Sequence, residues 1–319
     1  MNNVPVANSA PHRAFLDVAV PLAIEAGAII RAAFSDARAP PTPDNKDNNA
    51  IDLVTATDTA VEALVMARLR AAFPTYHFIG EETASAGGNC TLTDDPTVII
   101  DPVDGTTNFV HGFPYVCISM GLVVGRVPTA GVVYNPILND MYVAHAGYGS
   151  YVNGARLPLH RASEPASISS CLFISEGGHD RSPVALAAKL DTWRNLLSTP
   201  AAGGANVRGI RCTGSGALNL CTVARGSADA YWEVGLRAWD MAAGVVVVKE
   251  AGGWVVGQEY LGATAEVRAE YHARWARGEE LPGFDIMGRK ALAVRQKVPE
   301  LVHGLTGRIV DFPCIRDGQ

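Results

Sequence analysis

The feature that most restricts how this chain can fold is a buried strand that runs directly into a turn carrying two carboxylates. Residues 96–100 form a short apolar run rich in β-branched side chains, which predicts a buried strand. The stretch Asp101-Pro102-Val103-Asp104-Gly105-Thr106-Thr107-Asn108 follows where this strand should end. Because Pro102 has no N–H to donate, we expect it to end the ladder and stiffen the turn. Gly105 allows the tight turn and leaves its own N–H uncovered.

This turn places oxygen ligands beside hydrogen-bond donors. Asp101 and Asp104 offer the carboxylates that a hard cation prefers. Gly105 and Thr106 offer backbone N–H groups for an anion, and Thr106 is expected to open a short helix. A divalent metal ion that holds a phosphate satisfies both sets. The alternative is that both aspartates are ordinary turn or capping residues, but further acids elsewhere in the chain favour the metal site.

Composition limits the class of protein. The chain has 319 residues, enough for one or two domains, and its charged share of 18% is low, which indicates a large buried core. The net charge of −6 argues against a general nucleic-acid binder, which would show a basic surface. The six cysteines form no C-x-x-C pair, so we expect reduced thiols and a cytoplasmic protein. Pro21 and Glu25 interrupt the N-terminal apolar run, so we expect neither a membrane span nor a signal peptide.

The hydrophobic pattern changes near residue 160. Apolar residues recur at helical spacing over 15–34, where Pro21 should start or kink the helix, and over 61–72. Four runs then predict an antiparallel meander of strands: 116–124, 129–134, 141–146 and 149–152. After residue 160, strand and helix patterns alternate, which predicts a second α/β layer. We therefore predict an N-terminal α+β domain over 1–160 and a C-terminal α/β domain over 161–319.

Individual segments of the second half are also predicted. We expect strands at 170–175, 207–212 and 228–233, and helices at 183–198, 217–224 and 239–251. The small residues at 242–244 should let the last of these helices pack closely, and Gly252 should end it. Residues 259–280 indicate an exposed helix or insertion, and residues 289–303 a closing helix.

Further acids have two interpretations each. Asp58 begins a helix, so it is either a capping residue or a group that orients a catalytic hydroxyl. Glu81 and Glu82 end the short strand 77–80. Because adjacent residues of an extended chain point to opposite sides, one of them could face a site, or both could be surface acids. Asp240 is either a helix cap or a third metal carboxylate.

Two loops add candidates. Gly214-Ser215-Gly216 opens a predicted helix but lacks the third glycine of a dinucleotide fingerprint. We therefore interpret it as a glycine turn that lets a ligand approach the helix start. Lys46, in a loop rich in Pro, Asp and Asn, could reach a metal or phosphate or be simply solvated.

Four motifs together resemble the inositol monophosphatase family across residues 15–300. They are Asp52-Leu53-Val54-Thr55-Ala56-Thr57-Asp58, Gly80-Glu81-Glu82, the run from Asp101 to Pro114, and the run from Trp239 to Gly253. The resemblance implies an α/β (α+β) fold, a layered α/β/α/β/α sandwich. It further implies a homodimer, a requirement for two or three Mg²⁺ ions per site and inhibition by Li⁺.

The resemblance also implies a role for each site residue. The metal ligands would be Glu81, Asp101, the Val103 carbonyl, Asp104 and Asp240. Glu81 and Thr106 would orient the attacking water, with Asp58 behind Thr106. The substrate contacts would come from Gly105, Thr106, Asp104, Asp240, Gly214, Ser215, Gly216 and Glu233, the first two through N–H groups on the phosphate. Gly216 stands where the family often has Ala, and 259–280 is longer than in the family.

These roles predict Mg²⁺-dependent hydrolysis of myo-inositol 1-phosphate, a small phosphorylated polyol, by water. Four converging acids would repel one another strongly without metal, so we expect the site to be metal-loaded in use. The alternative substrates are histidinol phosphate, a sugar bisphosphate and a 3′-phosphoadenosine nucleotide, although Glu233 would repel a second phosphate. A non-catalytic regulator with the same fold is a further alternative, which the cost of burying an unneeded set of acids disfavours.

Overall fold

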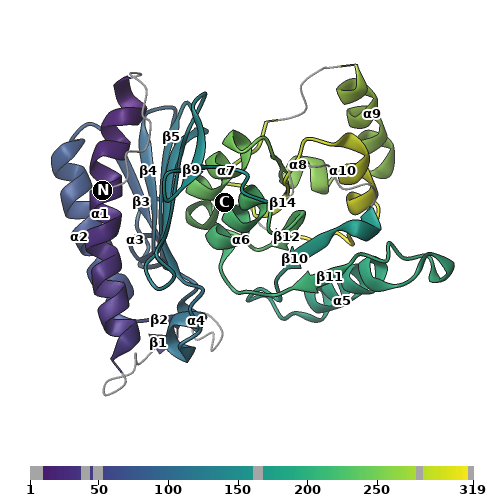
Figure 1. Cartoon of the computed structure of the whole chain (residues 1–319), viewed down its shortest axis with the longest axis horizontal. Helices are drawn as coiled ribbons and strands as arrows, with labels where there is room; N and C mark the ends of the chain where they lie inside the picture. The colour runs from purple at the N-terminus through teal and green to yellow at the C-terminus, as the bar shows by residue number, and fades with distance from the viewer. Residues whose placement is uncertain (1–9, 37–43, 46–52, 161–167, 278–282, 315–319) are drawn as a thin grey trace.

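The chain forms five stacked layers of helices and sheets in the computed structural model (Figure 1). The structure describes residues 10–36, 44–45, 53–160, 168–277 and 283–314. Lys46 and Asp52 lie outside these ranges, so their predicted roles stay predictions. The order of the layers is helices, sheet, helices, sheet, helices, which confirms the predicted α/β/α/β/α sandwich.

A seven-stranded sheet forms the second layer. In spatial order its strands are β3 (His77–Gly80), β4 (Thr97–Asp104), β5 (Cys117–Val124), β6 (Val127–Asn135), β7 (Asp140–His145), β8 (Gly149–Val152) and β9 (Ala155–Arg156). β3 and β4 are parallel, and every later pair is antiparallel, which confirms the predicted meander. A small ladder of β1 (Asp44–Asn45) and β2 (Leu53–Val54) lies apart from it.

Helices α1 (Ala10–Ser35) and α2 (Ala56–Ala72) cover the outer face of this sheet (Figure 1). α1 begins well before Pro21, which lies inside it. α1 is long enough and apolar enough to cross a membrane, and among the described residues it is the one helix that meets both criteria. One face of α1 nevertheless packs in the core beneath the sheet, through Phe15, Leu16, Ala19, Leu22, Ala23, Ala26 and Ile30.

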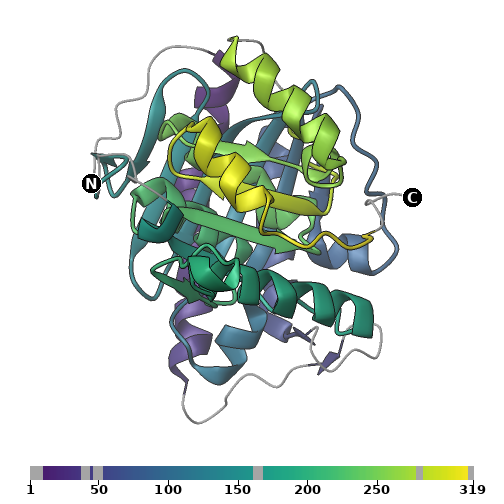
Figure 2. The ribbon, with the colours of Figure 1, turned by 90° about the vertical axis from the view of Figure 1, so that its right-hand side faces the viewer.

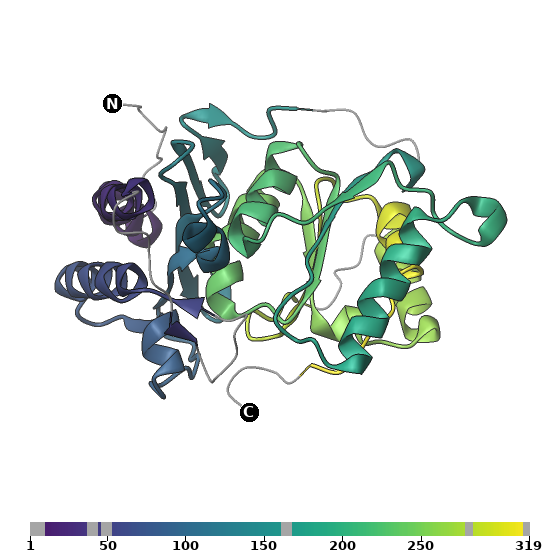
Figure 3. The same cartoon turned by 90° about the horizontal axis from the view of Figure 1, so that it is seen from below.

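The central layer consists of α6 (Gly216–Arg225) and α7 (Ala238–Glu250), which lie between the two sheets (Figure 3). α7 packs very closely on the first sheet: a Cβ added at Gly121 would lie 2.5 Å from the Ala242 Cβ. The predicted close packing of the small residues in α7 is therefore confirmed. This layer buries side chains from both halves of the chain, and the division into domains at residue 160 stays a prediction.

The second sheet has five strands and an outer cover of helices (Figure 2). In spatial order the strands are β11 (Gly209–Arg211), β10 (Leu172–Ser175), β12 (Ala230–Val234), β14 (Lys290–Val294) and β13 (Trp254–Val256). The outer helices are α5 (Pro183–Leu197), α8 (Gln258–Leu261), α9 (Ala265–Ala276) and α10 (Pro299–Thr306). Two short helices, α3 (Glu81–Ser85) and α4 (Thr106–His111), follow strands of the first sheet.

Two predictions about these elements are wrong. Residues 289–303 form β14 and then α10 rather than one helix. β14 lies between β12 and β13 and is buried on both faces, so its sequence lacks the alternation that marks a strand. Strand β4 also continues through Pro102, because a shift of register between Asp101 and Asp104 accommodates the proline and the pairing with β5 then resumes.

Candidate active site

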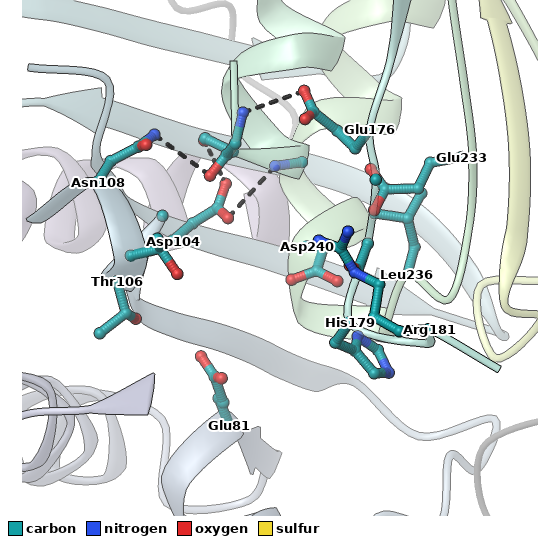
Figure 4. Close-up of a pocket in the computed structure, with 17 residues that line it drawn as sticks. Glu81, Asp104, Thr106, Asn108, Glu176, His179, Arg181, Glu233, Leu236 and Asp240 are labelled. Atoms are coloured by element: carbon teal, nitrogen blue, oxygen red, sulfur yellow. Dashed lines mark hydrogen bonds between the residues drawn. The ribbon is translucent and has the colours of Figure 1, made fainter. Parts of the chain in front are cut away.

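The candidate site is a cavity of about 320 Å³ between the first sheet and the C-terminal half of the chain (Figure 4). Nine of the predicted site residues line it: Glu81, Asp104, Gly105, Thr106, Gly214, Ser215, Gly216, Glu233 and Asp240. The three others, Asp58, Asp101 and Val103, are buried beside these residues. The structure therefore gathers predicted residues from six separate parts of the chain: 58, 81, 101–106, 214–216, 233 and 240.

Three aspartates form an acidic cluster at the cavity, two of them lining it and Asp101 buried beside them. Asp101, Asp104 and Asp240 each offer a carboxylate oxygen, and these atoms all lie within 4.8 Å of one another. Burial, and then the charges of Glu81 and Asp104, raise the pKa of Asp101 well above its usual value. Burial and the charge of Asp104 likewise raise the pKa of Asp240 to about 7. A set of oxygen donors that repel one another in this way is what a hard divalent cation would stabilise, so the residues fit such an ion.

Asp104 is held from behind by the start of α6. Its Oδ2 accepts the Ser215 hydroxyl at 2.6 Å and the Ala217 N–H at 2.7 Å, and its Oδ1 accepts the Gly216 N–H at 3.3 Å. Burial nevertheless raises its pKa, although these hydrogen bonds oppose the shift. The glycine turn thus lines the cavity and also orients a carboxylate, a role that the sequence analysis did not assign to it.

Asp58 combines the two roles that the sequence left open. It is fully buried in the first turn of α2, and its Oδ2 accepts the N–H and the hydroxyl of Thr55, the N-cap residue. Its Oδ1 lies 3.1 Å from the Thr106 hydroxyl, which also lies 3.1 Å from the Val103 carbonyl oxygen. Because both partners accept, the Thr106 proton points away from the cavity and a lone pair of its oxygen faces inward.

The two glutamates after β3 are placed differently from the prediction. Glu81 and Glu82 do not continue the strand; they open the short helix α3, with Gly80 as its N-cap. Glu81 lines the cavity, and its charge contributes to the raised pKa of Asp101. The side chains of Glu81 and Glu82 therefore point in different directions because of the helical turn, and not because they alternate along a strand.

Position 105 requires a residue without a side chain. Its φ of 92° is left-handed, and a Cβ there would lie 2.9 Å from the Tyr115 carbonyl oxygen. It serves as the N-cap of α4, whose first N–H groups have no partner within the helix. The neighbouring Asn108 donates its side-chain amide to the carbonyls of Tyr115 and Thr213, which joins α4 to the glycine turn.

Glu233 lies on the opposite side of the cavity, where it accepts a hydrogen bond from the Tyr231 hydroxyl. Burial and the charge of Glu176 raise the pKa of Glu233 to about 8. Glu176 was not predicted: it accepts the Thr213 N–H at 2.7 Å and the Gly214 N–H at 3.0 Å, and thereby fixes the glycine turn.

His179 and Arg181 also line the cavity and were missed (Figure 4). Both lie in the loop between β10 and α5, and Arg181 is anchored by its Nε–H to the Gly178 carbonyl at 2.9 Å. No local sequence pattern marks this loop as part of a site. Its residues are brought to the cavity by the pairing of β10 with β12, which is a tertiary contact.

Comparison with known proteins gives a consistent result. Residues 12–280 match the inositol monophosphatase family. The chain is 40% identical to inositol monophosphatase 1 of Bos taurus over 314 residues, which cover 97% of this chain and 99% of the relative. It is 44% identical to inositol monophosphatase 3 of Solanum lycopersicum over 242 residues, which cover 76% and 85%.

Solved structures support the same grouping. The inositol monophosphatase of Anabaena (Nostoc) superposes with a TM-score of 0.69 at 28% identity, over 94% of this chain and 97% of that chain. The extragenic suppressor protein suhB of Bartonella henselae superposes with a TM-score of 0.70 at 27% identity, over 93% and 98%. Since the match covers most of the sequence and the fold, the chain belongs to the inositol monophosphatase family, a family of phosphatases.

Proposed function

We propose that this protein hydrolyses myo-inositol 1-phosphate and related inositol monophosphates to inositol and phosphate. The observation that carries the proposal is the convergence of Asp101, Asp104 and Asp240 within 4.8 Å, in a cavity that Thr106 and Glu81 also line. The relatives named inositol monophosphatase support the substrate class. They give no support to histidinol phosphate, a sugar bisphosphate, a 3′-phosphoadenosine nucleotide or a regulatory role.

We propose Mg²⁺ as the cofactor, with two or three ions held by Glu81, Asp101, the Val103 carbonyl, Asp104 and Asp240. When bound, such ions withdraw charge from the phosphoryl oxygens and stabilise the leaving alkoxide. The all-oxygen donor set and the crowding of like charges support this choice of metal.

The attacking water would be oriented by Thr106 and Glu81. Asp58 and the Val103 carbonyl accept the Thr106 hydroxyl proton, so the Thr106 oxygen is left to accept a hydrogen bond from water. Figure 4 shows the Glu81 side chain below Thr106, also directed toward the cavity. A water that donates to both residues keeps its lone pair free for in-line attack on phosphorus.

The polyol would lie on the other side of the cavity, against Glu233 and the glycine turn. With a pKa of about 8, Glu233 is largely protonated at neutral pH before metal binds, so it can donate one hydrogen bond and accept another. A ring that carries several hydroxyls suits such a group, and the Gly105 and Thr106 N–H groups would hold the phosphate at the start of α4.

The test is phosphate release from myo-inositol 1-phosphate with and without Mg²⁺, beside histidinol phosphate, fructose 1,6-bisphosphate and 3′-phosphoadenosine 5′-phosphate. We expect rapid Mg²⁺-dependent release from the inositol ester and loss of release on addition of Li⁺. Faster release from another ester would contradict the proposed substrate, and release that persists in a chelator would contradict the proposed cofactor.

We propose further that the protein is a cytoplasmic homodimer that binds neither nucleic acid nor membranes. The net charge of −6 supports the lack of nucleic-acid binding, and the six cysteines, none of them in a C-x-x-C pair, support the location. The dimer is supported by one exposed apolar face of α5, formed by Leu186, Leu190 and Leu197, which are 41%, 48% and 49% exposed. Sedimentation of wild type and Leu190→Glu tests it: a wild-type monomer would contradict the proposal.

A further inference from the structure

We infer that Glu62, which does not line the cavity, is a positioning residue that holds Glu81 in the orientation needed for metal binding. The inference rests on the proposed function, because it assigns Glu62 a part in building that metal site. It follows from a hydrogen-bonded contact between α2 and α3, in which Glu62 lies outside all four family motifs.

The contact is a carboxylate that caps a helix belonging to another part of the chain. The Glu62 side chain is 4% exposed. Its Oε2 accepts the Glu82 N–H at 2.8 Å, and its Oε1 accepts the Thr83 N–H at 2.8 Å and the Thr83 hydroxyl at 2.5 Å. The N-cap residue of α3, Gly80, has no side chain to cap it. Glu62 therefore performs the capping that the local sequence lacks.

The position of Glu81 in α3 makes this capping relevant to the site. Glu81 is the first residue of α3, between Gly80 and the two residues whose N–H groups Glu62 binds. The hydrogen bonds to the N–H groups of Glu82 and Thr83 fix the backbone on the C-terminal side of Glu81. The pairing of β3 with β4 fixes the backbone on its N-terminal side. Without Glu62, the first turn of this five-residue helix would lose two of the bonds that define it.

Gly80 provides the space for this contact. A Cβ added at Gly80 would lie 2.6 Å from both the Glu62 carboxyl carbon and its Oε2, and 2.7 Å from the Met66 Cε at the flexible end of that side chain. The backbone of Gly80 is extended, with φ −117°, so an alanine could adopt it without strain. The glycine is thus required for the room it leaves to the carboxylate and to Met66, and not for its conformation.

Asp58 and Glu62 lie four residues apart on α2, so they share one face of the helix. Asp58 orients Thr106, and Glu62 orients the turn that carries Glu81. Both acids are buried, at 0% and 4% exposure. One helix therefore supports both side chains that the proposed mechanism places around the attacking water.

The experiment compares Glu62→Gln with a matched control, Glu250→Gln, by calorimetric titration of the whole protein with Mg²⁺. Glu250 is a suitable control because its carboxylate also accepts two backbone N–H groups, from Gly147 at 2.9 Å and Gly149 at 2.8 Å, outside the cavity. Both changes replace one acceptor oxygen by a donor, so both should lower the urea midpoint of unfolding. We expect Glu62→Gln to weaken Mg²⁺ binding at least fivefold and Glu250→Gln to change it less than twofold.

A second variant reaches the same contact without altering Glu62. Gly80→Ala should displace the carboxylate and weaken Mg²⁺ binding to a similar extent. The loss of Mg²⁺ affinity in the double variant should not exceed the larger of the two single losses, because both changes act through one contact. Additive losses, or equal Mg²⁺ affinity in Glu62→Gln and Glu250→Gln, would overturn the inference, as would a wild-type protein that binds no Mg²⁺.

The outcome is separable from that of the proposed function. If no inositol phosphate releases phosphate while Glu62→Gln still weakens Mg²⁺ binding, the proposed activity is wrong and the positioning role stands. If phosphate is released by wild type and Glu62→Gln binds Mg²⁺ normally, the activity stands and the positioning role is wrong.

Discussion

Ser215 donates its hydroxyl proton to Asp104 over 2.6 Å, although 111 residues separate the two in the chain. The contact joins the last residue of β4, in the first sheet, to the N-cap of α6, in the central layer. Donors from the α6 side thus fix a carboxylate whose other side faces the cavity. The orientation of this proposed metal ligand is in this way set by the protein itself.

Asp104→Asn should reduce kcat by about 10³-fold or more, because it removes a carboxylate from the acidic cluster. It should also lower the free energy of unfolding by about 1–3 kcal/mol, since a side-chain amide would face the Ser215, Gly216 and Ala217 donors. Steady-state kinetics and urea unfolding measure the two effects. Asp140→Asn, which alters a carboxylate paired with Arg225, is the control for stability alone. Near-wild-type turnover in Asp104→Asn would contradict the site.

Thr106→Val should lower kcat by about 10²-fold, because it removes the hydroxyl held between Asp58 and Val103 and keeps the shape. Thr106→Ser keeps the hydroxyl and should retain most activity. Thr107→Val, at the adjacent exposed position that also lines the cavity, is the matched control and should leave kcat within about twofold of wild type. Equal kcat values for the two valine variants would show that the Thr106 hydroxyl does not orient the water.

Gly105→Ala should destabilise the protein more than Gly112→Ala. Both glycines have positive φ, 92° and 70°, so an alanine would cost each about 1 kcal/mol of backbone strain. A Cβ at Gly105 also lies 2.9 Å from the Tyr115 carbonyl oxygen, whereas a Cβ at Gly112 has no neighbour within 4 Å among the described residues. Thermal unfolding of both variants measures the difference. Equal melting temperatures would show that the contact between a Cβ at position 105 and the Tyr115 carbonyl oxygen does not destabilise the protein.

The pH dependence of stability without metal should reveal Glu233. Its pKa is raised to about 8, so folding favours the protonated form. The stabilisation is complete below the unfolded pKa of a glutamate and is lost as pH rises through about 8. In EDTA, wild type should therefore lose stability between pH 5 and pH 8.5, and Glu233→Gln should lose about 1–2 kcal/mol less. Urea unfolding across this range is the measurement, and parallel profiles would contradict the assignment.

Several parts of the fold were predictable because they depend on local pattern. Residues close together in the chain predict the apolar stripes of α1 and α2, the meander from β5 to β8 and the end of α7 at a glycine. The predictions failed where burial was complete. β14 is buried on both faces, so its residues carry no alternation, and α3 begins at Glu81 because its cap comes from α2.

The candidate site divides in the same way. The identity of the acids can be read from the order and spacing of the motifs, which point to Asp101, Asp104, Glu81 and Asp240 and to the family of the chain. How the site is held becomes visible only in the folded chain, where Ser215 binds Asp104, Glu176 binds the glycine turn and Glu62 caps α3. A residue type fixes what a side chain can bind, whereas its partner is chosen by sheet order and helix packing, which here join residues between 20 and 111 positions apart.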